Sequence, residues 1–203
     1  MQRLTDLDLA AVAGEKHVRT TYVAPTLGYQ VALNMVFYIV PPEDNIQDFV
    51  LSVAPPTGPF VLPALELFPL EGILPDWAEG ARISGSAHEE IASIRSLVKG
   101  GEAVGGDMFL LEAAVHKGDK LIADVRYGGG CARHDFRLTW DGSLDKSDPP
   151  QALLKLSHDG NGDPCKALIS ERLTFDLSPH FEANADVVLR LEAGGAERIV
   201  PRI

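Results

Sequence analysis

The stretch Lys120-Leu-Ile-Ala-Asp-Val-Arg-Tyr127 alternates between two kinds of side chain with a period of two residues. Successive side chains of a strand point to opposite faces of a sheet, so this period indicates a strand with one buried face. We expect the buried face to carry Leu121, Ala123, Val125 and Tyr127, and the opposite face to carry Ile122, Asp124 and Arg126. The stretch therefore predicts a half-buried strand in the C-terminal half of the chain.

Further apolar segments lie on both sides of this strand at spacings that are typical of turns. They cover residues 109–116, 132–140, 152–158, 165–177, 187–191 and 198–203. Short strands at such regular spacing are typical of antiparallel sandwiches and barrels. We therefore predict a mainly β protein, with an antiparallel β-sandwich or partial barrel over residues 106–203 and one or two short helices elsewhere.

The chain between residues 20 and 105 is punctuated by proline. Proline cannot donate a backbone hydrogen bond, so it is confined to strand ends, sheet edges and turns. Residues 29–40 and 48–54 are the best strand candidates between these prolines. We therefore expect short strands in residues 20–105, which form either a separate part of the chain or one continuous domain over residues 20–203.

Two segments are predicted to be helical. Residues 5–14, within an N-terminal helix and tail of residues 1–19, begin at the potential cap Thr5 and end at Gly14. Residues 86–99 begin at the potential cap Ser86, carry two glutamates in the first turn and are followed by two glycines. Acidic residues near the start of a helix and glycine after its end are both favourable. We expect one short helix in each segment.

Acidic residues outnumber basic ones in this chain. Its 203 residues include 18 Lys plus Arg and 29 Asp plus Glu, which gives a formal net charge of −11 at pH 7. Nucleic-acid binding draws on clustered Lys and Arg, and no such cluster is present, so we expect no nucleic-acid partner. The longest apolar run, residues 31–40, is about half the roughly 20 residues that span a bilayer, so no transmembrane segment is expected.

The first residues are not expected to form a secretory signal. Such a signal combines a basic start with an apolar run of about seven or more residues, whereas Asp6 and Asp8 interrupt this start. As written, the chain is expected in the cytoplasm; if the start is trimmed, the periplasm or envelope is expected instead. Two cysteines are too few for the scaffold of a small secreted protein, although they can still form one pair.

Two short segments carry the chemically reactive side chains. Residues 128–134 contain Cys131 and His134, and residues 158–165 contain His158 and Cys165. Strand alternation places the two histidines and Cys165 in phase with apolar neighbours, so they should face the buried side. The glycines before Cys131 permit a bend that can bring this residue to the other three. The sequence therefore predicts that the four side chains converge at strand ends.

Three structural interpretations of this cluster remain open. The four residues form a Cys2His2 zinc site, Cys131 and Cys165 form a disulfide, or the cysteines are small buried hydrophobes beside histidines that bond to the backbone. A catalytic interpretation makes the Cys131 thiolate a nucleophile, with glycine N–H groups as an oxyanion site and His134 or His158 as the base. The candidate cofactor is therefore zinc or none.

The segment between His158 and Cys165 also resembles the start of a calcium-binding loop. Asp159, Asn161 and Asp163 match the first three ligand positions of such a loop. Pro164 stands where the loop needs a glycine, and no glutamate occupies the twelfth position. These departures favour a hairpin loop rich in Asp, Asn and Gly over a calcium site.

Several of these residues belong to a pattern that resembles an uncharacterised family of bacterial envelope proteins, many of them lipoproteins. The pattern consists of Tyr127-Gly-Gly-Gly-Cys131, His134 with Phe136, His158-Asp159, Asp163-Pro-Cys165-Lys-Ala167 and Leu173-Thr-Phe-Asp-Leu-Ser-Pro179. The resemblance implies that both cysteines and both histidines serve one motif, and that the protein is exported. It implies no established activity.

These observations favour a non-enzymatic binding or structural protein of the bacterial envelope, in which the cysteines and histidines act as a structural tie. Its ligand is unknown, and its expected partner is a protein or a small molecule. The alternative is a metal-dependent or thiol enzyme that uses Cys131, His134, His158 and Cys165.

Overall fold

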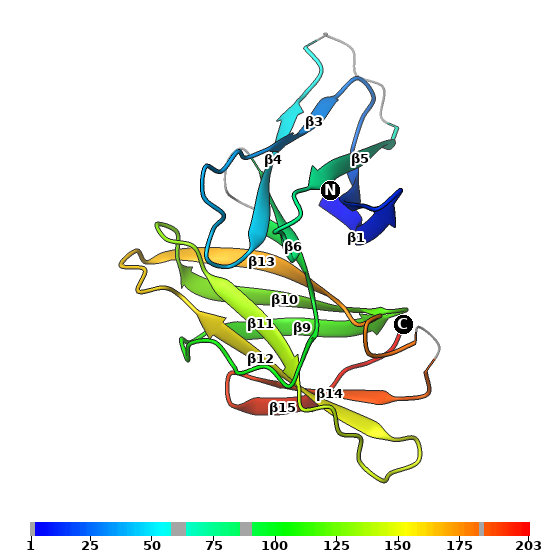
Figure 1. Ribbon diagram of the computed structural model, residues 1–203. Coiled ribbons are helices and arrows are strands. Elements are labelled where there is room, and N and C mark those ends of the chain that lie inside the picture. Colours follow the sequence, from blue (N-terminus) through cyan, green and yellow to red (C-terminus); the bar gives the residue numbers. More distant parts are fainter. Residues whose placement is uncertain (1–2, 58–63, 86–90, 183–184) are drawn as a thin grey trace. The chain divides into compact units, whose positions relative to one another are not determined.

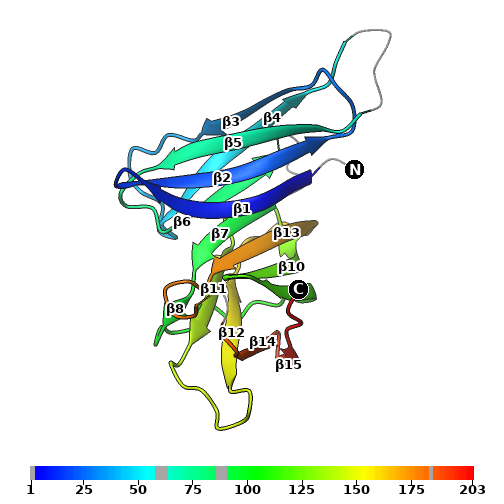
Figure 2. The same ribbon diagram turned by 90° about the vertical axis from the view of Figure 1, so that its right-hand side faces the viewer.

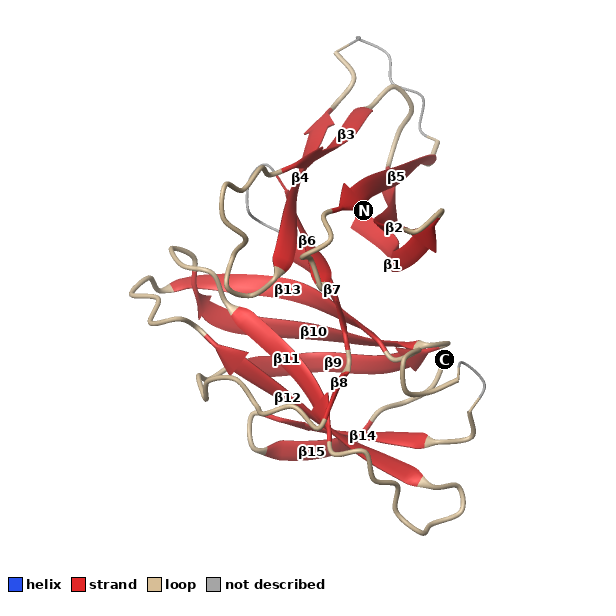
Figure 3. Cartoon of the chain, viewed as in Figure 1, coloured by secondary structure: helices blue, strands red, loops and turns tan. Residues whose placement is uncertain are grey.

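The computed structural model describes residues 3–57, 64–85, 91–182 and 185–203. The chain divides into two compact units, Met1–Ile94 and Arg95–Ile203. Every helix or strand assigned in the described ranges is a strand (Figures 1 and 3), so the prediction of a mainly β protein is confirmed. The same ranges contain no helix with the length and apolar character of a membrane span.

The first unit contains two groups of hydrogen-bonded strands. One group has the order β1, β2, β5 and the other the order β3, β4, β6, β7 (Figure 2). Their bounds are β1 Arg3–Val12, β2 Glu15–Ala24, β3 Gln30–Met35, β4 Ile46–Ala54, β5 Glu66–Leu74, β6 Gly80–Gly85 and β7 Ile91–Ser96, and the last two residues of β7 belong to the second unit. Val18, Phe49, Ile83 and Ile94 are almost completely buried and belong to one apolar cluster, which is the core of this unit.

The predicted helix over residues 5–14 is wrong. Residues Arg3–Val12 form strand β1, which pairs antiparallel with β2. Ala13 and Gly14 connect them with φ angles of 53° and 90°, and two successive positive φ angles are typical of tight hairpin turns. Gly14 therefore serves a hairpin turn and not the end of a helix.

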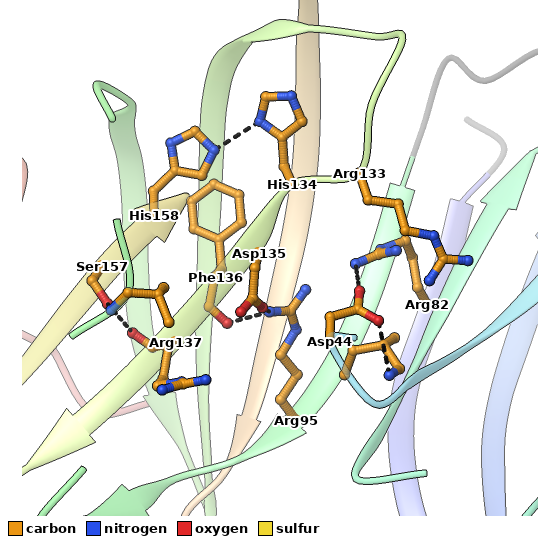
Figure 4. Close-up of polar contacts among 12 residues, drawn as sticks. Asp44, Arg82, Arg95, Arg133, His134, Asp135, Phe136, Arg137, Ser157 and His158 are labelled. Carbon is orange, nitrogen blue, oxygen red and sulfur yellow. Dashed lines mark hydrogen bonds and ion pairs between the residues drawn. The ribbon is translucent and has the colours of Figure 1, made fainter. Parts of the chain in front are cut away.

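The predicted helix over residues 86–99 is also wrong in its described part. Residues Ile91–Ser96 form β7 and Val98–Lys99 form β8, while residues 86–90 lie outside the described ranges. Three successive residues, Ser93, Ile94 and Arg95, are buried, whereas an amphipathic helix buries one stripe at intervals of three and four residues. The Arg95 guanidinium contacts the carboxylate of Asp135 and donates to the backbone oxygen of Phe136 (Figure 4). Tertiary contacts therefore override the helical pattern.

The second unit is built from two sheets. One has the order β13, β10, β9, and the other has the order β15, β14, β12, β11, β8. Their bounds are β8 Val98–Lys99, β9 Leu110–Lys117, β10 Lys120–Gly129, β11 Asp135–Trp140, β12 Gln151–Asp159, β13 Ala167–Asp176, β14 Val188–Ala193 and β15 Ala196–Ile199. Both sheets contribute to one apolar core: Leu121, Val125 and Leu173 come from the first sheet, and Phe136, Leu154 and Leu191 from the second.

The predicted strand over residues 120–127 is confirmed as the central part of β10. Its inward side chains Leu121, Ala123, Val125 and Tyr127 are buried, and the residues between them are half-buried. The expected antiparallel pairing holds for β10 with β9 and with β13. It does not hold throughout the second sheet, where β12 pairs parallel with β14. The reason is that β13, which lies between them in sequence, crosses to the other sheet.

The core of the second unit gives a matched pair of substitutions on adjacent residues of β12. Leu154 is 0% exposed, whereas Leu153 is 41% exposed. We expect Leu154→Ala to lower the free energy of unfolding by about 2–5 kcal/mol, because it leaves a cavity between the sheets. We expect Leu153→Ala to change it by about 0.5 kcal/mol or less.

Urea denaturation in a Trp77→Phe background checks this prediction, since Trp140 then reports the second unit alone. Equal destabilisation by the two substitutions would contradict the assignment of the buried face.

Candidate functional site

Two connections at one end of the second unit position the site. β10 ends at Gly129, opposite Ala167 of β13, and β11 begins at Asp135, opposite Asp159 of β12. Residues 130–134 and 160–166 therefore both run between the same two ladder ends, and each crosses from one sheet to the other. The first connection carries Cys131 and His134, and the second carries Asp163 and Cys165.

A disulfide joins the two connections. Cys131 and Cys165 are separated by 34 residues in sequence, and their Cα atoms lie 5.7 Å apart. Cys131 is exposed and Cys165 is half-buried. The predicted pairing of the two cysteines is therefore seen, with both sulfurs near the surface of the site.

The carboxylate of Asp163 is the centre of the polar network. Its Oδ2 atom accepts backbone N–H groups from Gly130, Cys131 and Ala132 at 2.8–2.9 Å, and its Oδ1 atom accepts the N–H of Cys165 at 2.8 Å. The side chain is only 2% exposed. These backbone N–H groups, led by that of Ala132, hold the pKa of Asp163 well below its usual range. Asp163 is therefore an ionised group that binds one connection to the other.

The two histidines extend this network into the unit. His134 Nε2 lies 3.1 Å from Asp163 Oδ2, and His134 Nδ1 lies 2.8 Å from His158 Nε2 (Figure 4). An ionised carboxylate only accepts hydrogen bonds, so Nε2 of His134 carries a proton. In a neutral His134, Nδ1 then accepts a hydrogen bond from Nε2–H of His158. The contact of His158 Nδ1 with the backbone oxygen of Asp107 is longer, at 3.4 Å.

Aromatic side chains surround the histidine pair. His158 stacks on Phe136 with ring centroids 4.3 Å apart, and Tyr127 lies 4.5 Å from His134 by the same measure. The hydroxyl of Tyr127 donates to the buried carboxylate of Glu171 at 2.9 Å. Burial, and secondly the repulsion from His134 when that ring is protonated, lower the pKa of His158 below its ordinary value. This environment therefore favours a neutral His158.

Two glycines allow the backbone to approach His134 closely. A Cβ atom on Gly129 would lie 2.3 Å from His134 Nε2 and 3.0 Å from Asp163 Oδ2. A Cβ atom on Gly160 would lie 3.3 Å from His134 Cε1. The glycine run before Cys131 therefore does more than bend the chain, because Gly129 leaves space for the imidazole.

The four predicted residues occupy one network, but they do not surround one point. In the described part of the chain, one group of three or more His, Cys, Asp or Glu side chains has ligand atoms within 4.8 Å of one another. Its members are Cys131, Asp163 and Cys165, so His134 and His158 lie outside it. The structure therefore groups the two cysteines with Asp163, and not with the two histidines of the expected Cys2His2 set.

The three candidate calcium ligands have separate structural roles. Asp159 accepts the backbone N–H of Asn161 at 2.8 Å, and the side-chain amide of Asn161 donates to the backbone oxygen of Arg133 at 2.9 Å. Asn161 and Gly162 both have positive φ angles, of 51° and 68°. Asp163 turns to the opposite connection, as described above. These residues therefore shape and anchor the loop.

Sequence reasoning missed Asp107 as well as the central role of Asp163. The Asp107 carboxylate accepts the backbone N–H of Gly160 at 2.8 Å, and the Asp107 N–H donates to the backbone oxygen of His158 at 3.2 Å. Next to it, a Cβ atom on Gly105 would lie 2.5 Å from that same backbone oxygen. The run Gly105-Gly106-Asp107 was the available signal, since it allows an irregular segment to pack closely against the end of β12.

No family model matches the chain, and no curated protein matches it. Among solved structures, the chain is similar to a protein of Parabacteroides distasonis ATCC 8503 that carries the description toxin-related. The TM-score is 0.40 and the sequence identity 15%, over 85% of this chain and 91% of that chain. A likeness this distant carries no argument about function.

Gly129 and Gly128 form a matched pair for testing the site. We expect Gly129→Ala to lower the free energy of unfolding by about 1–3 kcal/mol, because the new methyl group overlaps His134. Gly128→Ala is the control, since a Cβ atom there meets no atom within 4 Å. Thermal unfolding of both variants checks the prediction. A Gly129→Ala protein as stable as the control would contradict the close contact.

Histidine burial predicts the pH dependence of stability. Below the ordinary pKa of 6.5, His158 takes up a proton more readily in the unfolded chain than in the folded one, because its folded-state pKa is lowered. Its contribution to stability is therefore complete above pH 6.5 and is lost as the pH falls toward the folded-state value. We expect His158→Gln to give a smaller loss of unfolding free energy between about pH 6.5 and pH 5 than the unsubstituted chain shows.

Urea denaturation at a series of pH values measures this slope, and His180→Gln, which replaces a half-buried histidine outside the network, is the control. The prediction fails if His158→Gln leaves the slope unchanged while its fold is intact.

Proposed function

We propose that the protein is a non-enzymatic structural or binding protein in which the disulfide, Asp163 and the two histidines act as a structural tie. The observation that carries this proposal is the carboxylate of Asp163, which binds backbone N–H groups of the opposite connection beside the disulfide between the same two connections. The two links join the same segments. Such a doubled link suits a rigid end of a β unit, where loops present a binding surface on a fixed scaffold.

The same contacts argue against the thiol-enzyme alternative. A cysteine nucleophile needs a histidine base, but His134 uses both ring nitrogens for Asp163 and His158. An oxyanion site needs free backbone N–H groups, but those of residues 130–132 donate to Asp163. An ionised carboxylate beside the sulfurs also disfavours a thiolate by charge repulsion.

The two sheets of the second unit support an interpretation as a β-sandwich with one mixed sheet, because they share a single apolar core. The disulfide favours an oxidising location, since disulfides persist mainly outside the reducing cytoplasm. Together with the resemblance of residues 121–179 to bacterial envelope proteins, this supports a role in the periplasm or envelope, and it leaves open a lipoprotein form. The net charge of −11 favours a protein or small-molecule partner over a nucleic acid.

Removing the disulfide tests the tie. We expect the double variant Cys131→Ala, Cys165→Ala to lose about 3–4 kcal/mol of unfolding free energy, the chain-entropy value for a link across 34 residues. Urea denaturation in the Trp77→Phe background, where Trp140 reports the second unit, measures this loss. The reduced native sequence is the control and should unfold at about the same denaturant concentration as the variant.

Thiol counting in the denatured, unreduced protein completes the test, with an expected value of zero. Two reactive thiols, or a double variant as stable as the oxidised protein, would overturn the structural tie.

A further inference from the structure

We infer that Cys131, Cys165 and Asp163 form a binding site for a thiophilic divalent cation, of which Zn2+ is the type, once the disulfide is reduced. The inference goes beyond the structural tie, because it concerns the reduced form of the protein. In the zinc site expected from the sequence, two histidines accompanied the cysteines as ligands. In the site inferred here, Asp163 is the ligand that accompanies them. The site lies at the surface end of the network, where Cys131 is exposed.

The geometry of the three groups carries this inference. One ligand atom from each of Cys131, Asp163 and Cys165 lies within 4.8 Å of the other two. Ligand atoms around a tetrahedral zinc ion with bonds of about 2.0–2.3 Å are roughly 3.3–3.8 Å apart. The two Cα atoms, 5.7 Å apart, leave both sulfurs able to reach one ion after the bond between them is broken. Small side-chain rotations therefore convert the arrangement into a three-ligand site.

Asp163 can bind a cation without giving up its structural contacts. Its Oδ2 atom receives three backbone N–H groups and His134, whereas its Oδ1 atom receives a hydrogen bond from the N–H of Cys165. A carboxylate oxygen has two lone-pair positions, so Oδ1 can accept that N–H and also bind a metal ion. Nε2–H of His134 then fixes the orientation of the carboxylate, as outer hydrogen bonds do for metal ligands in general.

Charge selects the kind of ligand. Reduction by a phosphine breaks the sulfur–sulfur bond, with one water molecule supplying the oxygen of the phosphine oxide and the two protons of the new thiols. Two thiolates beside the carboxylate would repel one another, and a divalent cation removes this repulsion as it displaces the two thiol protons. Thiolate ligands favour zinc-like ions over Mg2+ and Ca2+, which prefer oxygen ligands alone.

Cobalt binding tests the site in the whole chain. The protein is reduced with a phosphine, freed of reductant and metal without oxygen, and titrated with Co2+, whose thiolate charge-transfer absorption reports sulfur ligation. We expect one Co2+ per reduced chain, displacement by Zn2+, and no such absorption in the oxidised protein. Mg2+ should not displace Co2+.

Two variants identify the ligands. Cys131→Ala, Cys165→Ala should abolish the charge-transfer absorption, and Asp163→Asn should weaken Co2+ binding at least tenfold, the lower end of the loss that even outer contacts of a metal site produce. Asp159→Asn is the matched control, because Asp159 is the last residue of β12, directly before this connection, and lies outside the ligand group. Zinc-edge X-ray absorption of the unsubstituted reduced protein gives a second measurement that does not depend on folding of a variant. It should show two sulfur and at least one oxygen neighbour.

The outcomes separate this inference from the structural tie. A reduced chain that stays folded and gives no cobalt absorption overturns the metal site and leaves the oxidised tie in place. A reduced chain that unfolds and is not refolded by Zn2+ also overturns the metal site, while it supports the tie. Equal binding by Asp163→Asn and Asp159→Asn, or a zinc ion with no sulfur neighbour, overturns the ligand assignment.

Discussion

The burial of one ionised carboxylate organises the site end of the second unit. Asp163 is almost completely removed from water, so its charge must be compensated by donors that the protein supplies. Those donors come from both crossing connections: three consecutive N–H groups of residues 130–132 and the N–H of Cys165. The shape of both connections is consequently fixed by the need to solvate a single side chain. The disulfide then lies beside this carboxylate and closes the same pair of segments.

The histidines connect this polar end to the apolar core. His134 contacts Asp163 on one side and His158 on the other, and His158 stacks on Phe136, which belongs to the core shared by the two sheets. The side chains therefore change in order from the ionised Asp163 through the two imidazoles to the apolar Phe136. Such a network is rigid because each side chain contacts a neighbour whose own position is fixed by further contacts. Gly129 and Gly160 have no side chain, so the backbone can lie close to the His134 ring.

Local patterns in the sequence predicted the strands of the second unit well and the polar network only in part. Residues 120–127 alternate because one face of β10 lies on a core, a cause that leaves its mark in the sequence. Gly14 suits both a helix end and a hairpin turn, so the local signal was ambiguous. The helix predicted over residues 86–99 could not take account of the partner of Arg95, because Asp135 lies 40 residues away in sequence. The sequence named Asp163 as a candidate calcium ligand but did not reveal its structural role, because its main partners are backbone N–H groups, which nearly every residue has.

The register of β10 against β13 has a consequence for the order of folding events. Antiparallel pairing of Gly129 with Ala167 already places the segments that carry Cys131 and Cys165 beside each other. Oxidation of the cysteines closes the short end of this ladder, from which pairing can proceed outward to Lys120 and Asp176. In a chain that is oxidised before β14 and β15 pack, the disulfide already holds the ends of the loop between β10 and β13 together. Pairing of these two strands then costs less conformational entropy. Early oxidation should therefore accelerate the folding of the second unit as well as stabilise the finished structure.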